Sequence, residues 1–177
     1  AGMNTEIPAD DPDRIERTMN FVADRIDVEW VKSFGHSTRV PRMSPPAFRH
    51  RLIEQARSNL QRIVLPEGNE PRTVAAAAIV ANRGIAQCVL LGNPDEIREV
   101  AAKQGVTLPA SVEIVDPVAA APRYIAPLVE RRKAKGMTPE RAEVELQDSI
   151  VVGTMMLALD EAAGLVSGAV HSTAHTI

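Results

Sequence analysis

The sequence is poor in aromatic residues and in cysteine. Phenylalanine, tryptophan and tyrosine together make up 3% of 177 residues, and cysteine occurs once, at Cys88. With so few rings, the core has to be built from alanine, valine, isoleucine and leucine, which favours helices and parallel strands over a β-sandwich. A single cysteine excludes an internal disulfide and is typical of a reducing compartment.

Long hydrophobic runs and an excess of positive charge are also missing. No apolar run approaches the roughly 20 residues of a membrane-spanning helix, and no signal peptide is visible. The net charge is −3 and the basic residues are scattered, so no feature indicates nucleic acid or an anionic membrane as a partner. No histidine and cysteine cluster has metal-ligand spacing, so we expect no metal. We therefore expect a soluble, cytoplasmic domain.

Residues 3–43 differ in pattern from the rest of the chain. Asp11, Pro12 and Asp13 are typical of a helix start, with proline in the first turn and acids at the positive end of the helix dipole. Apolar residues then recur at helical spacing at Ile15, Met19, Val22 and Ile26. Residues 33–42 have no periodicity and are interpreted as a linker. We interpret residues 1–2 as a cloning scar and residues 3–43 as the tail of an upstream region plus a linker.

From Ser44 onward, short apolar runs alternate with helical patterns. We expect helices at about 44–53, 71–83, 94–103, 123–135, 139–147 and 151–162, and strands at 63–65, 88–91, 112–115 and 165–166. This alternation predicts an α/β fold, a parallel sheet flanked by helices on both faces. Ligands of such folds bind beyond the carboxyl ends of the strands.

The segment after the last expected strand is the most informative of these strand ends. Residues 167–176 contain small side chains, hydroxyls and two imidazoles, His171 and His175. A loop of this composition can offer backbone N–H groups and hydroxyls to an anion. At the first strand end, Glu67 and Glu70 could shape the loop, but we interpret them as solvated. Cys88, between apolar neighbours, is interpreted as a buried, inert thiol.

Five ordered motifs resemble the phosphate acetyltransferase and butyryltransferase family. In chain order they are Ile63 to Thr73 (IVLPEGNEPRT), Arg83 to Asn93, Ile114 to Pro117, Leu128 to Thr138 (LVERRKAKGMT) and Gly164 to Thr173 (GLVSGAVHST). The resemblance covers residues 44–177. It implies an isocitrate-dehydrogenase-like fold of two subdomains, of which residues 44–177 form the first, truncated before the second. Residues 3–43 resemble the end of the additional N-terminal region of the long bacterial form.

The resemblance implies a phosphate acetyltransferase, which transfers an acetyl group between coenzyme A and inorganic phosphate without an acyl-enzyme. The implied partners are CoA or acetyl-CoA, acetyl phosphate and phosphate. CoA is a substrate here, so no cofactor is expected. A homo-oligomer active in acetate metabolism is also expected. The main catalytic groups are expected beyond Ile177, so their positions are unknown and the chain alone should be inactive.

The same resemblance supplies candidate binding residues for the phosphoryl substrate. Arg132 matches the family arginine that contacts this substrate, and we expect it to lie near the strand-end loop. That loop contributes Ser167, Gly168, His171, Ser172 and Thr173. From residue type alone, Arg132 is interpreted as a solvated helix arginine, and only the family match favours a role in binding. The hydroxyls at 172 and 173 read equally as substrate donors and as turn formers. His171 is interpreted as structural rather than as a general base, and Ser167-Gly168 as a point of close backbone approach.

Two other functions remain open at this point. Domains similar to this one are fused to malic enzymes, where they sense acetyl-CoA without catalysis. A phosphate butyryltransferase would share the same motifs. Residues 3–43 resemble the long acetyltransferase rather than a dehydrogenase tail, which favours the acetyltransferase.

Overall fold

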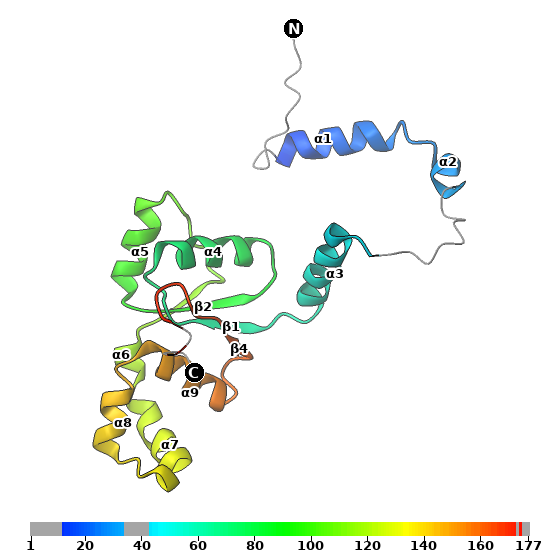
Figure 1. Ribbon diagram of the computed structural model, residues 1–177. Helices are drawn as coiled ribbons and strands as arrows, with labels where there is room; N and C mark the ends of the chain where they lie inside the picture. Colours follow the sequence, from blue (N-terminus) through cyan, green and yellow to red (C-terminus); the bar gives the residue numbers. More distant parts are fainter. Residues whose placement is uncertain (1–11, 34–42, 173, 175–177) are drawn as a thin grey trace. The chain divides into compact units, whose positions relative to one another are not determined.

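The computed structural model describes residues 12–33, 43–172 and 174, and its contacts divide the chain into two units, Ala1–Ser44 and Pro45–Ile177. The first unit contains α1 (Pro12–Ala23) and α2 (Val28–Ser33) (Figure 1). The predicted start of α1 at the proline is confirmed. The sequence pattern did not predict α2, which begins after Asp27, whose carboxylate accepts hydrogen bonds from the backbone N–H groups of Glu29 and Trp30 at 2.9 and 3.1 Å.

The apolar side chains of α1 are exposed within their own unit. Met19, Val22 and Ile26 are between 46 and 66% exposed, and with Ile15 they line one shallow hollow. The helical spacing is therefore confirmed, whereas its apolar face is not covered by the described residues of this unit.

The second unit is built on a four-stranded, wholly parallel sheet with the order β3-β2-β1-β4. Its strands are β1 (Arg62–Leu65), β2 (Gln87–Leu91), β3 (Glu113–Val115) and β4 (Gly164–Leu165). The chain builds outward from β1 through β2 to β3, and then returns to place β4 on the other side of β1. The strand order thus reverses between β1 and β4, the place where open parallel sheets form a ligand crevice. The expected α/β parallel sheet is confirmed.

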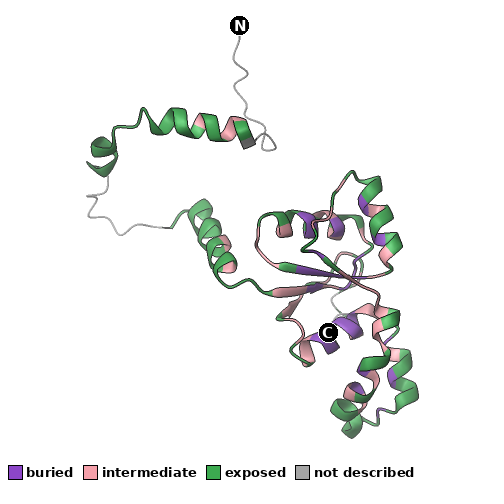
Figure 2. Cartoon of the chain, turned by 180° about the vertical axis from the view of Figure 1, so that it is seen from behind, coloured by how far each residue is buried: buried purple, intermediate pink, exposed green. Residues whose placement is uncertain are grey.

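Helices cover both faces of this sheet (Figures 1 and 2). One face packs against α4 (Pro71–Asn82) and α5 (Pro94–Lys103), and the other packs against α7 (Pro122–Arg132), α8 (Pro139–Glu145) and α9 (Ser149–Ala158). Side chains of β2 alternate between the two cores, since Cys88 and Leu90 enter the first and Val89 and Leu91 the second. A sheet buried on both faces explains why its strands read as continuous apolar runs.

Two of the differences between the observed and the predicted helices have a clear local cause. A short helix, α6 (Pro117–Ala120), follows β3 because Asp116 caps it, accepting from the N–H of Val118 at 2.9 Å. The last helix runs from residue 149 to 158 rather than from 151 to 162. Asp148 caps its start, and Asp160 has a left-handed φ of 57° beyond its end. Local polar groups that the apolar pattern does not report therefore determine these ends.

Helix α3 (Pro45–Ser58) precedes the sheet and has no buried residues. Its apolar side chains Phe48 and Leu52 are 53 and 47% exposed. Among the described helices of the whole chain, none is long and apolar enough to span a bilayer.

Candidate substrate-binding edge of the sheet

The carboxyl ends of β1 and β4 carry the most distinctive polar arrangement of the unit. Glu67 follows β1, and residues 166–172 form a loop that follows β4. Glu67 is 5% exposed, and among the described residues it is the only charged residue that is buried. Our interpretation of Glu67 as a solvated carboxylate is therefore wrong.

The loop after β4 folds around the Glu67 carboxylate. Oε2 accepts from the backbone N–H groups of Gly168 and Ala169 at 3.1 and 2.7 Å. Oε1 accepts from the N–H groups of Val170 and His171 at 2.8 and 2.7 Å. Four consecutive N–H groups thus converge on one carboxylate, an arrangement known as an anion-binding nest. The predicted ability of this loop to bind an anion through its backbone is present, but the anion belongs to the chain itself.

These donors keep Glu67 ionised despite its burial. Desolvation is the largest influence and raises the pKa, but the hydrogen bonds from the backbone of His171, Val170 and Ala169 and from the His171 ring together outweigh it. The pKa of Glu67 is lowered from 4.5 to about 2. A buried charge that accepts several charge-assisted hydrogen bonds holds its partners firmly.

The ring of His171 takes part in the same arrangement. Its Nδ1 lies 2.8 Å from Oε1 of Glu67, and its side chain is 29% exposed. An ionised carboxylate only accepts, so Nδ1 is the protonated nitrogen and donates. The hydrogen bond determines the tautomer and the orientation of the ring. This geometry agrees with the structural interpretation of His171.

Two glycines allow this geometry, each for a different reason. Gly168 has a φ of +117°, which side chains disfavour, and a Cβ there would meet no atom within 4 Å. Its role is therefore conformational, and the expected close backbone approach at this residue is wrong. Gly68 has that role instead: its N–H donates to the Leu91 carbonyl at 2.9 Å, and a Cβ would lie 2.5 Å from that oxygen.

Arg72 holds the loop from its other side. Its Nη2 donates to the carbonyl oxygen of Ala169 at 2.6 Å, and its Nε donates to Glu70 at 2.6 Å. Glu70 in turn caps α4, accepting from the N–H of Thr73 at 3.0 Å. Glu70 thus shapes the first loop rather than being solvated. The segment after β1 therefore anchors both the N–H groups and a carbonyl of the loop after β4.

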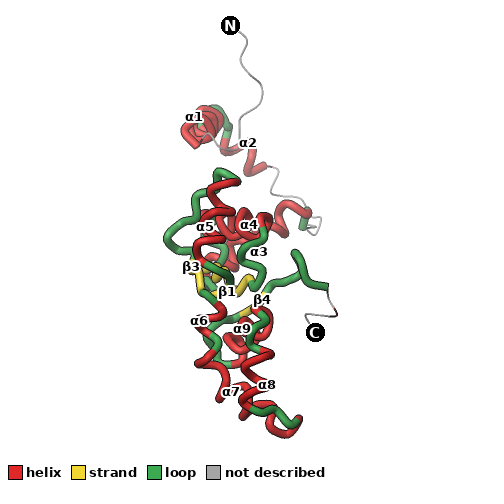
Figure 3. Tube along the Cα trace, turned by 90° about the vertical axis from the view of Figure 1, so that its left-hand side faces the viewer, coloured by secondary structure: helices red, strands yellow, loops and turns green. Residues whose placement is uncertain are grey.

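Arg132 lies elsewhere in the unit. It is at the end of α7, and its Nη1 is 3.1 Å from Glu145 of α8, with side-chain exposures of 51 and 29%. Figures 1 and 3 show α7 and α8 extending away from the sheet, whereas the 166–172 loop lies at the sheet. The structure does not bring Arg132 to this loop, because α7 leads away from the sheet and the chain turns into α8 at Gly136, whose φ is 71°.

The remaining candidates have varied positions. The hydroxyl of Ser167 is buried and lacks a hydrogen-bond partner among the described residues, and Ser172 is exposed. Thr173 and His175 lie outside the described residues. Cys88 is 3% exposed, and burial raises the pKa of its thiol, as expected of an inert core cysteine.

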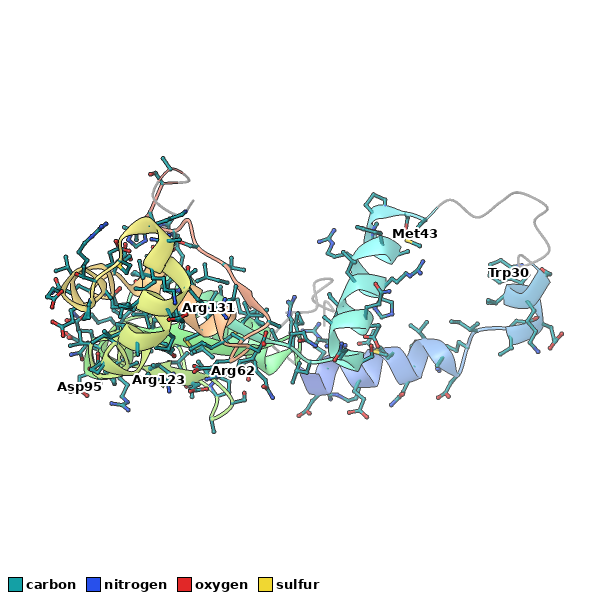
Figure 4. All side chains as sticks on the ribbon, turned by 90° about the horizontal axis from the view of Figure 1, so that it is seen from below. Trp30, Met43, Arg62, Asp95, Arg123 and Arg131 are labelled. Atoms are coloured by element: carbon teal, nitrogen blue, oxygen red, sulfur yellow. The ribbon has the colours of Figure 1, made fainter. Side chains whose placement is uncertain are left out.

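A second polar cluster occupies the opposite, amino-terminal edge of the sheet. Arg62 donates to the backbone carbonyl of Glu161 at 2.6 Å and pairs with Glu113 at 2.7 Å. Arg123 pairs with the Glu161 carboxylate at 2.8 Å, and the hydroxyl of buried Tyr124 donates to it at 2.7 Å (Figure 4). These groups are hydrogen-bonded to one another, and they lie at the edge opposite to the one where ligands of such folds bind. Within the described ranges, no set of three or more histidine, cysteine or acidic side chains could hold a metal ion.

The sheet order and the strand-end loop define a class of protein: a doubly wound α/β domain, a class whose ligands bind where the strand order reverses, here between β1 and β4. Residues 47–177 match the model of the family described as "Phosphate acetyl/butaryl transferase". The chain therefore belongs to the phosphate acetyl/butaryl transferase family.

Individual relatives support the assignment of the chain to this family. The phosphate acetyltransferase of Salmonella typhimurium is 58% identical over 175 residues, which cover 98% of this chain and 24% of that protein. The enzyme of Pseudomonas aeruginosa is 55% identical, over 99% of this chain and 25% of that protein. A crystal structure of a phosphotransacetylase from Streptococcus pyogenes superposes with a TM-score of 0.70 at 35% identity, covering 76% of this chain and 41% of that one. The chain thus spans about a quarter of the length of the curated relatives it matches.

Proposed function

We propose that this chain is part of a phosphate acetyltransferase, which converts acetyl-CoA and phosphate into CoA and acetyl phosphate. The observation that carries the proposal is the 58% identity to a phosphate acetyltransferase over nearly the whole chain, which includes the region of residues 3–43. The relatives named here are acetyltransferases, so identity favours acetyl over butyryl transfer and an enzyme over a sensing domain.

The chemistry defines what a complete site has to supply. In the direction of acetyl-CoA formation, the CoA thiolate attacks the carbonyl carbon of acetyl phosphate and forms a C–S bond. The C–O bond to phosphate breaks, and phosphate leaves with the electron pair, while a base takes the thiol proton. The developing oxyanion and the phosphate need N–H, hydroxyl or cationic donors. CoA is a substrate in this scheme, and no cofactor is needed.

In this proposal the chain contributes one wall of the crevice. Ser167, Gly168, His171 and Ser172 lie on the loop at the β1/β4 edge, Thr173 follows them in the sequence, and Arg132 is the family arginine at the end of α7. Residues 44–177 are the first subdomain, and residues 3–43 connect it to an upstream region. The protein is proposed to act in the cytoplasm as a homo-oligomer.

The test is an assay of thioester absorbance with acetyl phosphate and CoA. The full-length protein should turn over, whereas the 177-residue chain should not, because losing even one preorganised donor can cost about 10²–10³ in rate. Butyryl phosphate serves as the competing substrate. A full-length protein that prefers butyryl phosphate, or that binds acetyl-CoA without turnover, would overturn the proposal in favour of the corresponding alternative.

A further inference from the structure

The Glu67 carboxylate is unusual because it uses donors that a phosphate would otherwise attract. Nests of consecutive N–H groups commonly hold external anions. Here the four N–H groups of residues 168–171 and the Nδ1 of His171 are within 3.1 Å of the two Glu67 oxygens. While Glu67 occupies this position, these backbone groups are not available to a substrate phosphate.

The loop lies beyond the backbone pairing of the sheet. It has exposed or half-buried side chains at residues 166–172 and it leaves β4 after a strand of two residues. Backbone pairing with β1 ends at the hydrogen bond from the Val166 N–H to the Val64 carbonyl, at 3.0 Å. Beyond this point, Glu67 binds the loop through four backbone N–H groups and the His171 ring, and Arg72 binds the Ala169 carbonyl.

Glu67 itself is firmly held. It lies two residues after the end of β1, and the next residue, Gly68, is hydrogen-bonded to the end of β2 and has no room for a side chain. The carboxylate is therefore presented from the rigid centre of the sheet to the loop of the neighbouring strand. A charge on a rigid element that binds four backbone groups of a loop determines the conformation of that loop.

We propose that Glu67 is a positioning residue, an internal anion around which the 166–172 loop folds so that the His171 ring and the exposed Ser172 hydroxyl, rather than the loop backbone, face the acyl phosphate. The proposal rests on the proposed function for the identity of the substrate. The folding of the loop around Glu67 is independent of it. Both parts are therefore tested separately.

The first experiment measures backbone amide exchange in the 177-residue chain. Glu67→Gln keeps the shape of the side chain but replaces one acceptor oxygen by an NH₂ donor. Two of the four backbone N–H groups then face a donor instead of an acceptor. Amide exchange in residues 167–171 should accelerate about tenfold or more, because this is the effect of losing one charge-assisted hydrogen bond. The amides of β1 and β2 should stay protected. The matched control is Glu143→Gln, the same change on the exposed surface of α8, which should leave the loop unaffected. Equal protection in both variants would overturn the proposal.

A second measurement does not depend on a variant that folds. In the wild-type chain, the amide resonances of Ala169 and His171 should show no titration between about pH 3.5 and 5.5, since the carboxylate they bind stays ionised well below the ordinary value of 4.5. A midpoint near 4.5 at these amides would show an ordinary, solvated carboxylate and would also overturn the proposal.

The third experiment uses the full-length protein and the acetyl phosphate and CoA assay. Glu67→Gln should raise KM for acetyl phosphate about tenfold and leave KM for CoA within about twofold, whereas a mere loss of folded enzyme would lower kcat alone. Glu67→Asp, which keeps the charge, should recover part of the effect. Unchanged KM values in an active wild-type background would overturn the positioning role. An inactive wild-type protein would instead overturn the proposed function.

Discussion

Glu67 and Arg132 are two charged residues of one unit that differ in burial and in the number of their hydrogen-bond partners. Glu67 is buried at the end of a central strand and accepts five hydrogen bonds from a single loop. Arg132 is half exposed at the end of an outer helix and has an ion pair with Glu145. Sequence motifs indicated the arginine as the important group and passed over the carboxylate.

The difference teaches how each charge can be used. A buried carboxylate surrounded by donors is costly to move and is suited to holding structure. An exposed arginine in a surface ion pair gains little from that pair and can exchange its partner for a substrate phosphate. The following predictions test this division of roles, from the largest expected effect to the smallest.

The acid sensitivity of the chain should depend on Glu67. Its pKa is lowered from 4.5 to about 2, so its contribution to stability is fully present above pH 4.5 and is lost as the pH falls from 4.5 through 2. Between these limits, the wild-type free energy of unfolding should fall more than that of Glu67→Gln by on the order of 3 kcal/mol. Urea unfolding at several pH values measures this, and the difference between the two proteins removes the contribution of other groups. Parallel curves would show that Glu67 is not specially held.

Arg132 should matter for catalysis rather than for folding. In the full-length protein, Arg132→Ala should raise KM for acetyl phosphate and lower kcat, with kcat/KM falling about 10²-fold, and Arg132→Lys should recover only part of it. Arg141→Ala is the matched control, since Arg141 lies 3.7 Å from the same Glu145. Equal losses in both variants would mean that only the ion pairs with Glu145 matter.

Gly68→Ala should destabilise the chain through the backbone next to Glu67. The new Cβ would lie 2.5 Å from the Leu91 carbonyl oxygen, which cannot move without disturbing β2, so we expect a loss of about 2 kcal/mol. Gly164→Ala is the control, because its nearest neighbour is the tip of the Ile63 side chain at 3.1 Å, which can move. Thermal unfolding compares the two, and similar losses would contradict the steric explanation.

Glu145→Gln should have the smallest effect. It removes the partner of Arg132, but the pair is partly exposed, so the free energy of unfolding should change by less than about 1 kcal/mol. If Arg132 is held in reserve for phosphate, this variant should also leave KM for acetyl phosphate unchanged or slightly lower. A stability loss as large as that of Gly68→Ala would show that the α7–α8 pair depends on this contact.

Much of the fold could be predicted from the residues alone. Short apolar runs such as residues 88–91 marked the strands, and proline with a capping residue marked helix starts such as Asn93-Pro94, because burial period and backbone chemistry are local properties. The sequence pattern missed the helix at residues 117–120 and predicted too late a start for α9, because it does not report the caps at Asp116 and Asp148.

The candidate site was predicted less completely. The loop at residues 167–172 was recognised from its composition and from its position after a strand. The one signal for Glu67 was its place shortly after β1, at the edge where ligands of such folds bind, and a loop carboxylate there reads equally as solvated. The five donors that bury it come from residues about a hundred positions later in the chain.

The sequence by itself determined the strand and helix alternation, the family and the candidate edge for ligand binding. The tertiary structure alone decided that β4 pairs with β1, which brings Glu67 next to the loop after β4. The backbone N–H groups of residues 168–171 therefore bind Glu67 rather than an external anion. It also decided that Arg132 lies on the outer α7–α8 pair. The physical reason is that strand periodicity and capping act between neighbours in sequence, whereas the environment of a charge depends on which groups the sheet order brings into contact.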